Sequence, residues 1–347
     1  MKGSQLGCFC YFFAGIGKHF SIGKVNAKLK IKIVSRPLII LMLLVLSTWT
    51  LGNAKQNKLH ATSVNTLLNQ VAQAYQSPPV SARVDSVWKL LPALNGTKLN
   101  ITKTMNGWNA QEPGTTLLVF DQIPPAVDTA AFKDVPIYRG NPLKRQIALM
   151  FNVAWGEEYL PKIVSILRDH HVKATFFIDG KWASTHQLML RELVKAGMEL
   201  GNHGYNHHLF SKMSKFQMMT DLSKTNTNIK SVTGISPILF APPAGDFNTL
   251  AVKVAAGLGM KTVLWTVDTV DWRRPQPEVI AMRVLMKKTP GVLVLMHPTL
   301  PTTSALPVII DNLQKEKYQI VSVSDLLNPN RPRPNNLKEA LDGLRSP

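Results

Sequence analysis

Short apolar runs alternate with segments of helical spacing along residues 146–323 of this 347-residue chain. The apolar runs, which predict buried strands, lie at 147–151, 174–178, 197–201, 237–240, 262–265, 292–296 and 319–323. The predicted helices lie at 157–170, 182–196, 215–232, 248–258, 277–287 and 304–315. Strands that alternate with helices in this way predict an α/β fold with a parallel sheet, closed or nearly closed into a (β/α) barrel.

Five of the apolar runs are followed at once by polar or chemically capable residues. These clusters are Asn152–Gly156, Asn202–His207, Ala241–Gly245, Asp268–Trp272 and His297–Pro298. The carboxyl ends of the strands in a (β/α) barrel meet at one face, and active sites lie on that face. The pattern therefore predicts one site to which all five clusters contribute.

The chain is expected to have four parts. They are a basic N-terminal flank at 1–55, a small α+β module at 56–140, the barrel at 145–328 and a tail at 329–347. Within the module, residue spacing predicts helices at 64–75 and 83–91 and strands at 98–104 and 115–120. The tail is rich in Pro, Asn and Arg and is expected to be loose, with a short helix at 337–344.

The N-terminal flank has the pattern of an export signal. Its first 55 residues carry eight Lys and Arg and no acid, and an uncharged apolar stretch runs from Leu38 to Leu51. The stretch is interpreted as a signal peptide cleaved after Ala54 or as a membrane anchor, with a buried core helix as the alternative. Both cysteines, Cys8 and Cys10, lie in this flank, which excludes a disulfide scaffold and a cysteine-based zinc site further along.

The chain remains basic without its flank. The formal net charge is +19, and removing the eight flank cations leaves about +11 (19 − 8). Such a surface favours anionic partners, including anionic lipid and anionic wall polymers. Nucleic acid is not expected as a partner, because no Lys/Arg stripe with interleaved aromatic residues occurs.

Two histidines have a spacing that suits a metal ion. His203 and His207 are separated by three residues and follow a predicted strand, so both imidazoles can reach one divalent ion. A pair of surface histidines on a helix is the alternative interpretation.

The last two clusters combine carboxylates with a histidine. His297 follows a buried strand and is a candidate general acid, or otherwise a structural imidazole. Of Asp268 and Asp271, one carboxylate can orient a histidine from another strand. In the alternative interpretation Asp271 caps a turn and Asp268 bonds to backbone.

Taken together, these motifs resemble the polysaccharide deacetylase family, carbohydrate esterase family 4, over roughly residues 145–328. The matching segments are Ala174–Phe177, Glu199–His203, Pro242–Pro243, Trp265–Asp268, Asp271–Trp272 and Leu295–His297. The chain is similar in particular to an exported, sporulation-associated branch in which Asn-Val-Ala-Trp-Gly replaces the usual first motif. The resemblance implies a distorted (β/α) barrel and metal-dependent hydrolysis of the acetamide C–N bond of a glycan.

The resemblance also implies roles for particular residues. His203 and His207 match the metal histidines of the family, usually with zinc bound. His297 matches the general acid, and Asp268 matches the carboxylate associated with it. Trp155, Pro243 and Trp272 are candidates for contact with the sugar.

The chain departs from the family pattern at three places. Asn152 stands at the position of the catalytic base, and Val153 or Ala154 stands at that of the metal-binding aspartate. Ala241 replaces the arginine that pairs with the base. The resemblance therefore implies that zinc or another divalent metal is weakly held or absent.

Two main functions and one further class remain open from the sequence. One is an exported N-deacetylase that acts on peptidoglycan or a chitin-like glycan. The other is a non-catalytic relative that binds or scaffolds cell-wall glycan, and a division or sporulation assembly factor is a third class. In each case the expected location is the cell envelope or the extracellular space, with membrane contact through the N-terminal segment.

Overall fold

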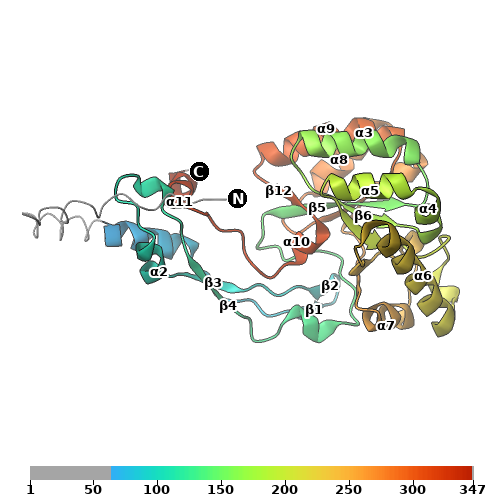
Figure 1. Cartoon of the computed structure of the whole chain (residues 1–347), viewed down its shortest axis with the longest axis horizontal. Helices are drawn as coiled ribbons and strands as arrows, with labels where there is room; N and C mark the ends of the chain where they lie inside the picture. The colour runs from blue at the N-terminus through green and yellow to red at the C-terminus, as the bar shows by residue number, and fades with distance from the viewer. Residues whose placement is uncertain (1–63, 346–347) are drawn as a thin grey trace, which may run out of the picture. The chain divides into compact units, whose positions relative to one another are not determined.

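The structure, a computed structural model, describes residues 64–345 (Figure 1). From Asn65 onward the chain forms one compact unit. The predictions for the N-terminal flank, including the stretch from Leu38 to Leu51 and the two cysteines, lie outside the described residues. Among the residues described, no helix is both long enough and apolar enough to cross a membrane.

The main sheet of the described chain is parallel throughout and curls into an open barrel. Its strands are β5 (Gln146–Val153), β6 (Thr175–Ile178), β7 (Glu199–Asn202), β8 (Leu239–Phe240), β9 (Lys261–Thr262), β10 (Val267–Asp268), β11 (Leu293–Met296) and β12 (Gln319–Val321). They follow the order β10-β11-β5-β6-β7-β8-β9, and β12 pairs with the first residues of β5. No pairing joins β9 to β10, so the barrel is open between them. The run predicted at 262–265 therefore does not form one strand that leads to Asp268.

Helices cover the outer face of the sheet (Figure 1). They are α3 (Leu160–Asp169), α4 (Gly180–Thr185), α5 (Gln187–Lys195), α6 (Lys215–Thr233), α7 (Thr249–Gly257), α8 (Pro277–Lys287) and α9 (Leu300–Lys315). The short helix α10 (Val323–Leu327) instead packs with the inner hydrophobic cluster that contains Ala148 and Met150. Each of the six predicted barrel helices has a counterpart, although the helix predicted at 182–196 is divided into α4 and α5. The prediction of an α/β barrel of this type is confirmed.

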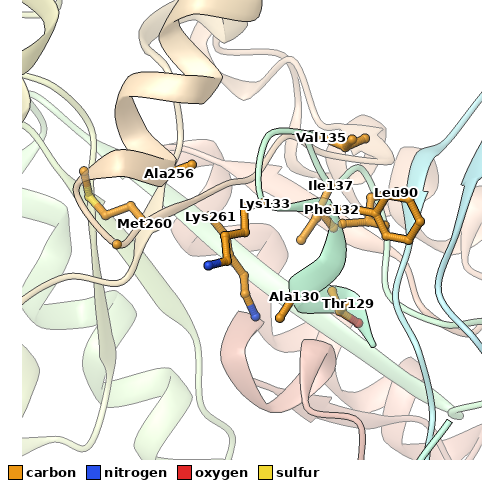
Figure 2. Close-up of a pocket in the computed structure, with 11 residues that line it drawn as sticks. Leu90, Thr129, Ala130, Phe132, Lys133, Val135, Ile137, Ala256, Met260 and Lys261 are labelled. Carbon is orange, nitrogen blue, oxygen red and sulfur yellow. The ribbon is translucent and has the colours of Figure 1, made fainter. Parts of the chain in front are cut away.

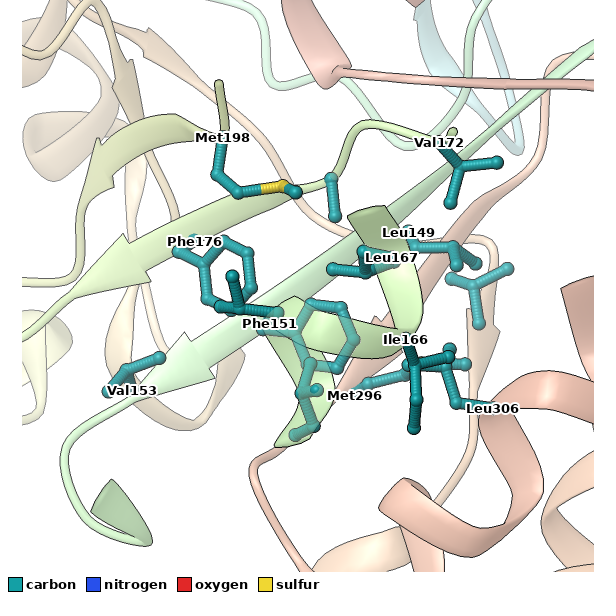
Figure 3. Packing of buried hydrophobic residues seen from close by; sticks show 14 of the residues in the cluster. Leu149, Phe151, Val153, Ile166, Leu167, Val172, Phe176, Met198, Met296 and Leu306 are labelled. Atoms are coloured by element: carbon teal, nitrogen blue, oxygen red, sulfur yellow. The ribbon is translucent and has the colours of Figure 1, made fainter. Parts of the chain in front are cut away.

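Strand β5 shows why the sheet has two buried faces. All eight of its residues are buried, and its side chains alternate between two hydrophobic clusters. Leu149, Phe151 and Val153 pack under the outer helices (Figure 3), whereas Ala148 and Met150 face the interior of the barrel. Such a strand reads as one apolar run, which is why it was recognisable in the sequence.

The small module contains a helix at 64–75 and two antiparallel pairs of strands. The pairs are β1 (Arg83–Asp85) with β2 (Lys89–Leu91) and β3 (Gly96–Leu99) with β4 (Phe120–Ile123), and α2 (Ile101–Asn106) lies between the latter two. The helix predicted at 83–91 is wrong, because this segment forms a hairpin whose turn is capped by Asp85 Oδ1 at 2.9 Å from Val87 N. The strand predicted at 115–120 is displaced to β4.

The tail, predicted to be loose, is instead tied to the small module. Leu118 N donates to Asn335 O at 2.9 Å, and Leu337 N donates to Thr116 O at 3.0 Å. Helix α11 (Leu337–Arg345) follows, and Tyr75 donates its hydroxyl to Ala340 O at 3.0 Å. The prolines of the tail prevent a regular ladder of strand hydrogen bonds. Single backbone hydrogen bonds and arginine side chains hold the tail against the module instead.

Candidate functional site

A cavity of about 470 Å³ lies at the carboxyl ends of the barrel strands. Its lining includes side chains from all five predicted clusters. They are Asn152, Ala154, Trp155, His203, His207, Ala244, Trp265, Asp268, Trp272, Leu295 and His297. The structure thus brings seven of the candidate site residues named from the sequence into one cavity, whereas Pro243 and Asp271 do not line it.

The end of β5 decides which residue stands at the metal-aspartate position. Val153 is fully buried in the outer hydrophobic cluster, so it points away from the cavity (Figure 3). Asn152 and Ala154 line the cavity instead. Between the two alternatives left open by the sequence, the geometry therefore favours Ala154, which offers a methyl group and no ligand atom.

Asn152 is the polar residue of this strand end. It is buried, and its Oδ1 has no hydrogen-bond partner among the described residues. A buried acceptor without a partner is unusual in a folded protein and marks a place where a ligand or water can donate. The side chain is an amide, however, and an amide does not take up a proton near neutral pH.

Gly156 holds the loop after β5 against the loop after β11. Its φ is +80°, and a Cβ at this position would lie 2.1 Å from Pro298 O. Only glycine allows both this backbone conformation and this approach. The contact places the Trp155 indole parallel to the His297 ring, with ring centroids 5.9 Å apart and an interplanar angle of 2°.

His203 is held with one nitrogen available to the cavity. Its Nδ1 lies 2.7 Å from Ala241 O, and because a carbonyl can only accept, Nδ1 carries the proton. Nε2 is then the unprotonated nitrogen. The His207 ring lies 5.3 Å from the His203 ring, centroid to centroid. Burial lowers the pKa of His203 to about 3 and also lowers the pKa of His207, so both imidazoles are neutral at pH 7.

The carboxylates that could join this histidine pair are engaged elsewhere. Asp179 caps α4 through Lys181 N at 2.8 Å and also accepts from His207 N at 2.9 Å. Asp246 accepts from Ser211 N at 2.7 Å, and Glu157 Oε1 lies 3.8 Å from His186 Nε2. Among the described residues, no group of three or more His, Cys, Asp or Glu side chains can hold a metal ion. The donor set therefore does not fit the two histidines and aspartate of the family site.

His297 is paired with Asp271, not with Asp268. Asp271 is fully buried and lies 2.8 Å from His297 Nδ1 through Oδ1. Its Oδ2 accepts from His297 N at 2.7 Å and from Thr302 Oγ1 at 2.6 Å. Asp268 lines the cavity but accepts from Val270 N at 2.8 Å, as a turn residue does. The prediction that Asp268 orients His297 is therefore corrected, and Thr302 is a member of the site that sequence reasoning missed.

The third cluster contributes shape and no charge. Ala241 is buried in the inner hydrophobic cluster, and its carbonyl oxygen accepts the hydrogen bond from His203 Nδ1. Pro243 is buried beside Gly204, and the next residue, Ala244, reaches the cavity with φ +56°. A direct contact between Pro243 and a sugar is therefore not supported by its position, whereas Trp155 and Trp272 are 39% and 48% exposed at the cavity.

Similarity to known proteins extends over about three quarters of the chain. The chain is 40% identical over 265 residues to the uncharacterized protein YlxY of Bacillus subtilis, covering 76% of this chain and 83% of that protein. The sequence profile described as polysaccharide deacetylase matches residues 139–263. The crystal structure of a CE4 family pseudoenzyme from Bacillus anthracis superposes with a TM-score of 0.69 at 38% identity, covering 76% of this chain and 95% of that one. The chain belongs to the polysaccharide deacetylase family.

Named enzymes of the polysaccharide deacetylase family are more distant. The peptidoglycan-N-acetylglucosamine deacetylase of Listeria monocytogenes is 30% identical over 183 residues, which cover 52% of this chain and 39% of that protein. A mutant of the Bacillus anthracis pseudoenzyme described as having restored enzymatic activity has a TM-score of 0.69 at 37% identity.

A second cavity, of about 210 Å³, lies between residues 129–137 and the α7–β9 region (Figure 2). Its walls are mainly apolar, with Phe132, Val135 and Met260 among them, and the amines of Lys133 and Lys261 lie at its side. It contains none of the residues of the family motifs. The family motifs therefore give no reason to place a catalytic site in this second cavity.

The buried His203 predicts a stability that depends on pH. The unfolded chain binds this proton near pH 6.5, whereas the folded protein binds it only near pH 3. The stabilising contribution is full above pH 6.5 and is lost as the pH falls towards 3, by about 3 kcal/mol between pH 6.5 and about pH 4. His203→Asn keeps a donor for Ala241 O and does not titrate. Urea unfolding across this range, with a chelator present, should show a shallower loss of stability for the variant, and equal slopes would contradict the assignment.

Proposed function

We propose that this protein is an exported, non-catalytic member of the polysaccharide deacetylase family that binds cell-wall glycan in the cavity at the strand ends. The observation that carries the proposal is the donor set around His203 and His207. Ala154 and Asn152 line the wall where carboxylates belong, and the nearby Asp179 and Asp246 are bonded elsewhere.

The chemistry of the two replaced positions supports this proposal. A general base contributes about 10²- to 10⁴-fold to a hydrolysis rate, and Asn152 cannot act as one. Because the nearby carboxylates of Asp179 and Asp268 accept hydrogen bonds from backbone N–H groups, a divalent metal would be held by too few ligands for a site of this family.

The loss of charge at the site is also consistent between the ends of two different strands, β5 and β8. An arginine at position 241 would be buried, since Ala241 has no exposed surface, and it would lack the aspartate with which it pairs. A buried charge without its partner costs several kcal/mol. Neutral residues at both 152 and 241 avoid that cost, and the similar Bacillus anthracis protein is itself described as a pseudoenzyme.

The features needed to hold a sugar are retained. The half-exposed Trp155 and Trp272 side chains offer apolar ring faces at a cavity that also contains hydrogen-bonding groups, a combination common in ligand sites. Relatives named as peptidoglycan deacetylases support a cell-wall glycan as the ligand, and the N-terminal flank supports export.

One observation favours a working hydrolase instead. The His297–Asp271 pair has the geometry of an oriented imidazole, which a purely binding protein does not need. Three measurements on the purified protein distinguish the two functions. They are its zinc content, the release of acetate from peptidoglycan fragments and chitooligosaccharides, and the quenching of its tryptophan fluorescence by the same glycans.

The expected result is binding without acetate release. Trp155→Ala should weaken glycan binding about tenfold, as expected from the loss of about 1–1.5 kcal/mol of aromatic contact. Trp108→Ala, in the small module, is the matched control and should leave binding unchanged. Stoichiometric zinc with acetate release that His297→Ala abolishes would establish the hydrolase.

A further inference from the structure

A third cavity, lined mainly by polar residues, lies at the opposite end of the barrel from the cavity at the strand ends, which is called the glycan cavity below. It measures about 240 Å³ and is formed near the first residues of β5 and β12, where the tail passes. Five of its eight lining residues are cationic and none is acidic. The cationic residues are Lys144, Arg145, Lys317, Arg331 and Arg333, and together they are called the basic pocket below.

Lys144 lines the basic pocket, but its ammonium group has no free N–H donor for a ligand. Its side chain is 2% exposed, and Nζ donates to Asp325 O at 2.8 Å, Leu326 O at 3.1 Å and Asn328 O at 2.9 Å. An ammonium has three protons, so these carbonyls use them all. Burial lowers the pKa of Lys144 to about 8. This residue closes the end of α10 and fixes the start of the tail.

Arg145 and Lys317 are the exposed cations of the basic pocket. Arg145 donates through Nε and Nη2 to Glu316 O, at 3.3 and 2.7 Å, and its guanidinium stacks over Tyr318 at 4.8 Å. An arginine has five N–H donors, so its remaining donors stay available. Within the described residues, the Lys317 ammonium makes no hydrogen bond or ion pair.

Arg331 and Arg333 are held in place by neutral acceptors. Arg331 donates to Asn95 O at 3.0 Å and to Pro78 O at 3.1 Å, and Arg333 donates to Thr97 and Ser77. Neither forms an ion pair with a described carboxylate. Burial lowers the pKa of Arg333, and the positive charge of Arg331 lowers it further.

The acids nearest in sequence to this cluster do not line the pocket, and the charge of Asp325 only partly opposes the lowering of the Lys144 pKa by burial. Asp325 accepts from Ser322 through Oδ2 at 2.8 Å, and Glu316 pairs with Lys288 at 2.9 Å. The basic pocket is therefore a concave site whose positive charge has no anionic partner among the residues that line it.

We propose that the basic pocket binds a phosphate group of an anionic wall polymer made of phosphodiester-linked polyol units. Several guanidinium groups held in fixed positions match the oxygens of a phosphate, and a pocket rather than a stripe suits a single anionic group. No aromatic residue lines it, so it lacks the stacking platform of a single-stranded nucleic-acid site. The proposal rests on export to the wall, which is part of the proposed function, but not on glycan binding at the strand ends.

The test measures binding of the full chain to three probes. They are a soluble poly(glycerol phosphate), inorganic phosphate, and vesicles of phosphatidylcholine with phosphatidylglycerol. Arg145→Gln/Lys317→Gln removes two exposed charges from the basic pocket. Lys162→Gln/Lys253→Gln removes two exposed lysines from α3 and α7 and is the charge-matched control.

The pocket double variant should lose about tenfold in affinity for the polymer, and its slope of log affinity against log salt should fall by about two, one for each cation removed. With the parent protein, inorganic phosphate should compete with the polymer for the basic pocket. Arg145→Lys, which keeps the charge but lacks the planar fork, should fall between the parent and the double variant. Glycan binding should stay at the parental value, which separates this proposal from that for the glycan cavity, and urea unfolding should show that the variant is folded although it lacks the Arg145 bonds to Glu316 O.

Other outcomes would overturn the proposal. An equal loss in the control variant would show attraction by overall charge, and binding to the vesicles alone would assign the patch to a lipid surface. If inorganic phosphate did not displace the polymer, a phosphate pocket would also be excluded.

Discussion

Ala154→Asp is expected to create a zinc site at the carboxyl ends of the strands. The new carboxylate would project into the cavity beside His203 and His207, because Ala154 lines that cavity. Two imidazoles and one carboxylate with an open position form a recognised zinc set, so about one zinc per chain should remain after dialysis of the variant. Metal content by mass spectrometry and a rise in melting temperature on adding zinc are the measurements. Adding Asn152→Asp and Ala241→Arg should then give acetate release.

Val153→Asp is the matched control for this experiment. Val153 is fully buried in the outer hydrophobic cluster (Figure 3), so an aspartate there meets apolar side chains and not the histidines. It should bind no zinc and should lose several kcal/mol of stability, because a buried charge is left without a partner. Zinc binding by Val153→Asp but not by Ala154→Asp would show that the direction of these two side chains has been assigned wrongly.

Asp271→Ala is expected to be the most destabilising single change at the site. It leaves His297 N, the His297 imidazole and Thr302 Oγ1 without their acceptor, in a place where Asp271 itself is fully buried. Unsatisfied buried groups cost about 1–3 kcal/mol each, so the free energy of unfolding should fall by about 3–5 kcal/mol. Urea unfolding measures the loss, and NMR of the His297 ring should show that its orientation has changed.

Asp268→Ala separates the two carboxylates. Asp268 is half-buried and accepts from Val270 N, so its loss should cost no more than about 1 kcal/mol and should leave the His297 ring signals unchanged. If Asp268→Ala disturbed His297 as strongly as Asp271→Ala does, the pairing seen in the structure would be contradicted.

The fold was largely predictable because buried parallel strands form unbroken apolar runs and the helices between them have a clear period. The hairpin at 83–91 was not, since each of its strands has only three residues, too few to show alternation. In a segment this short, a turn capped by Asp85 determines the structure more than hydrophobic spacing does.

Most members of the candidate site could be predicted from the sequence, but Thr302, the partner of His297 and the residue at the metal-aspartate position could not. Asp268 and Asp271 are three residues apart, and the left-handed Val270, with φ +52°, turns the chain between them so that only Asp271 meets His297. That conformation has no mark in the sequence, because valine rarely adopts it. The choice between Val153 and Ala154 needed the register of β5, which fixes the face on which each side chain lies.

The hydrogen bonds between the tail and the small module change what counts as a domain boundary in this chain. The residues that bond to the segment before the barrel come from after it, within one compact unit that begins at Asn65. A fragment that ends at residue 328 would keep every strand of the barrel and yet remove the partners of Thr116, Leu118 and Tyr75. Proteolysis between 329 and 336 should therefore loosen a region that lies more than 200 residues earlier in the sequence, as the 265-residue separation of Tyr75 and Ala340 illustrates.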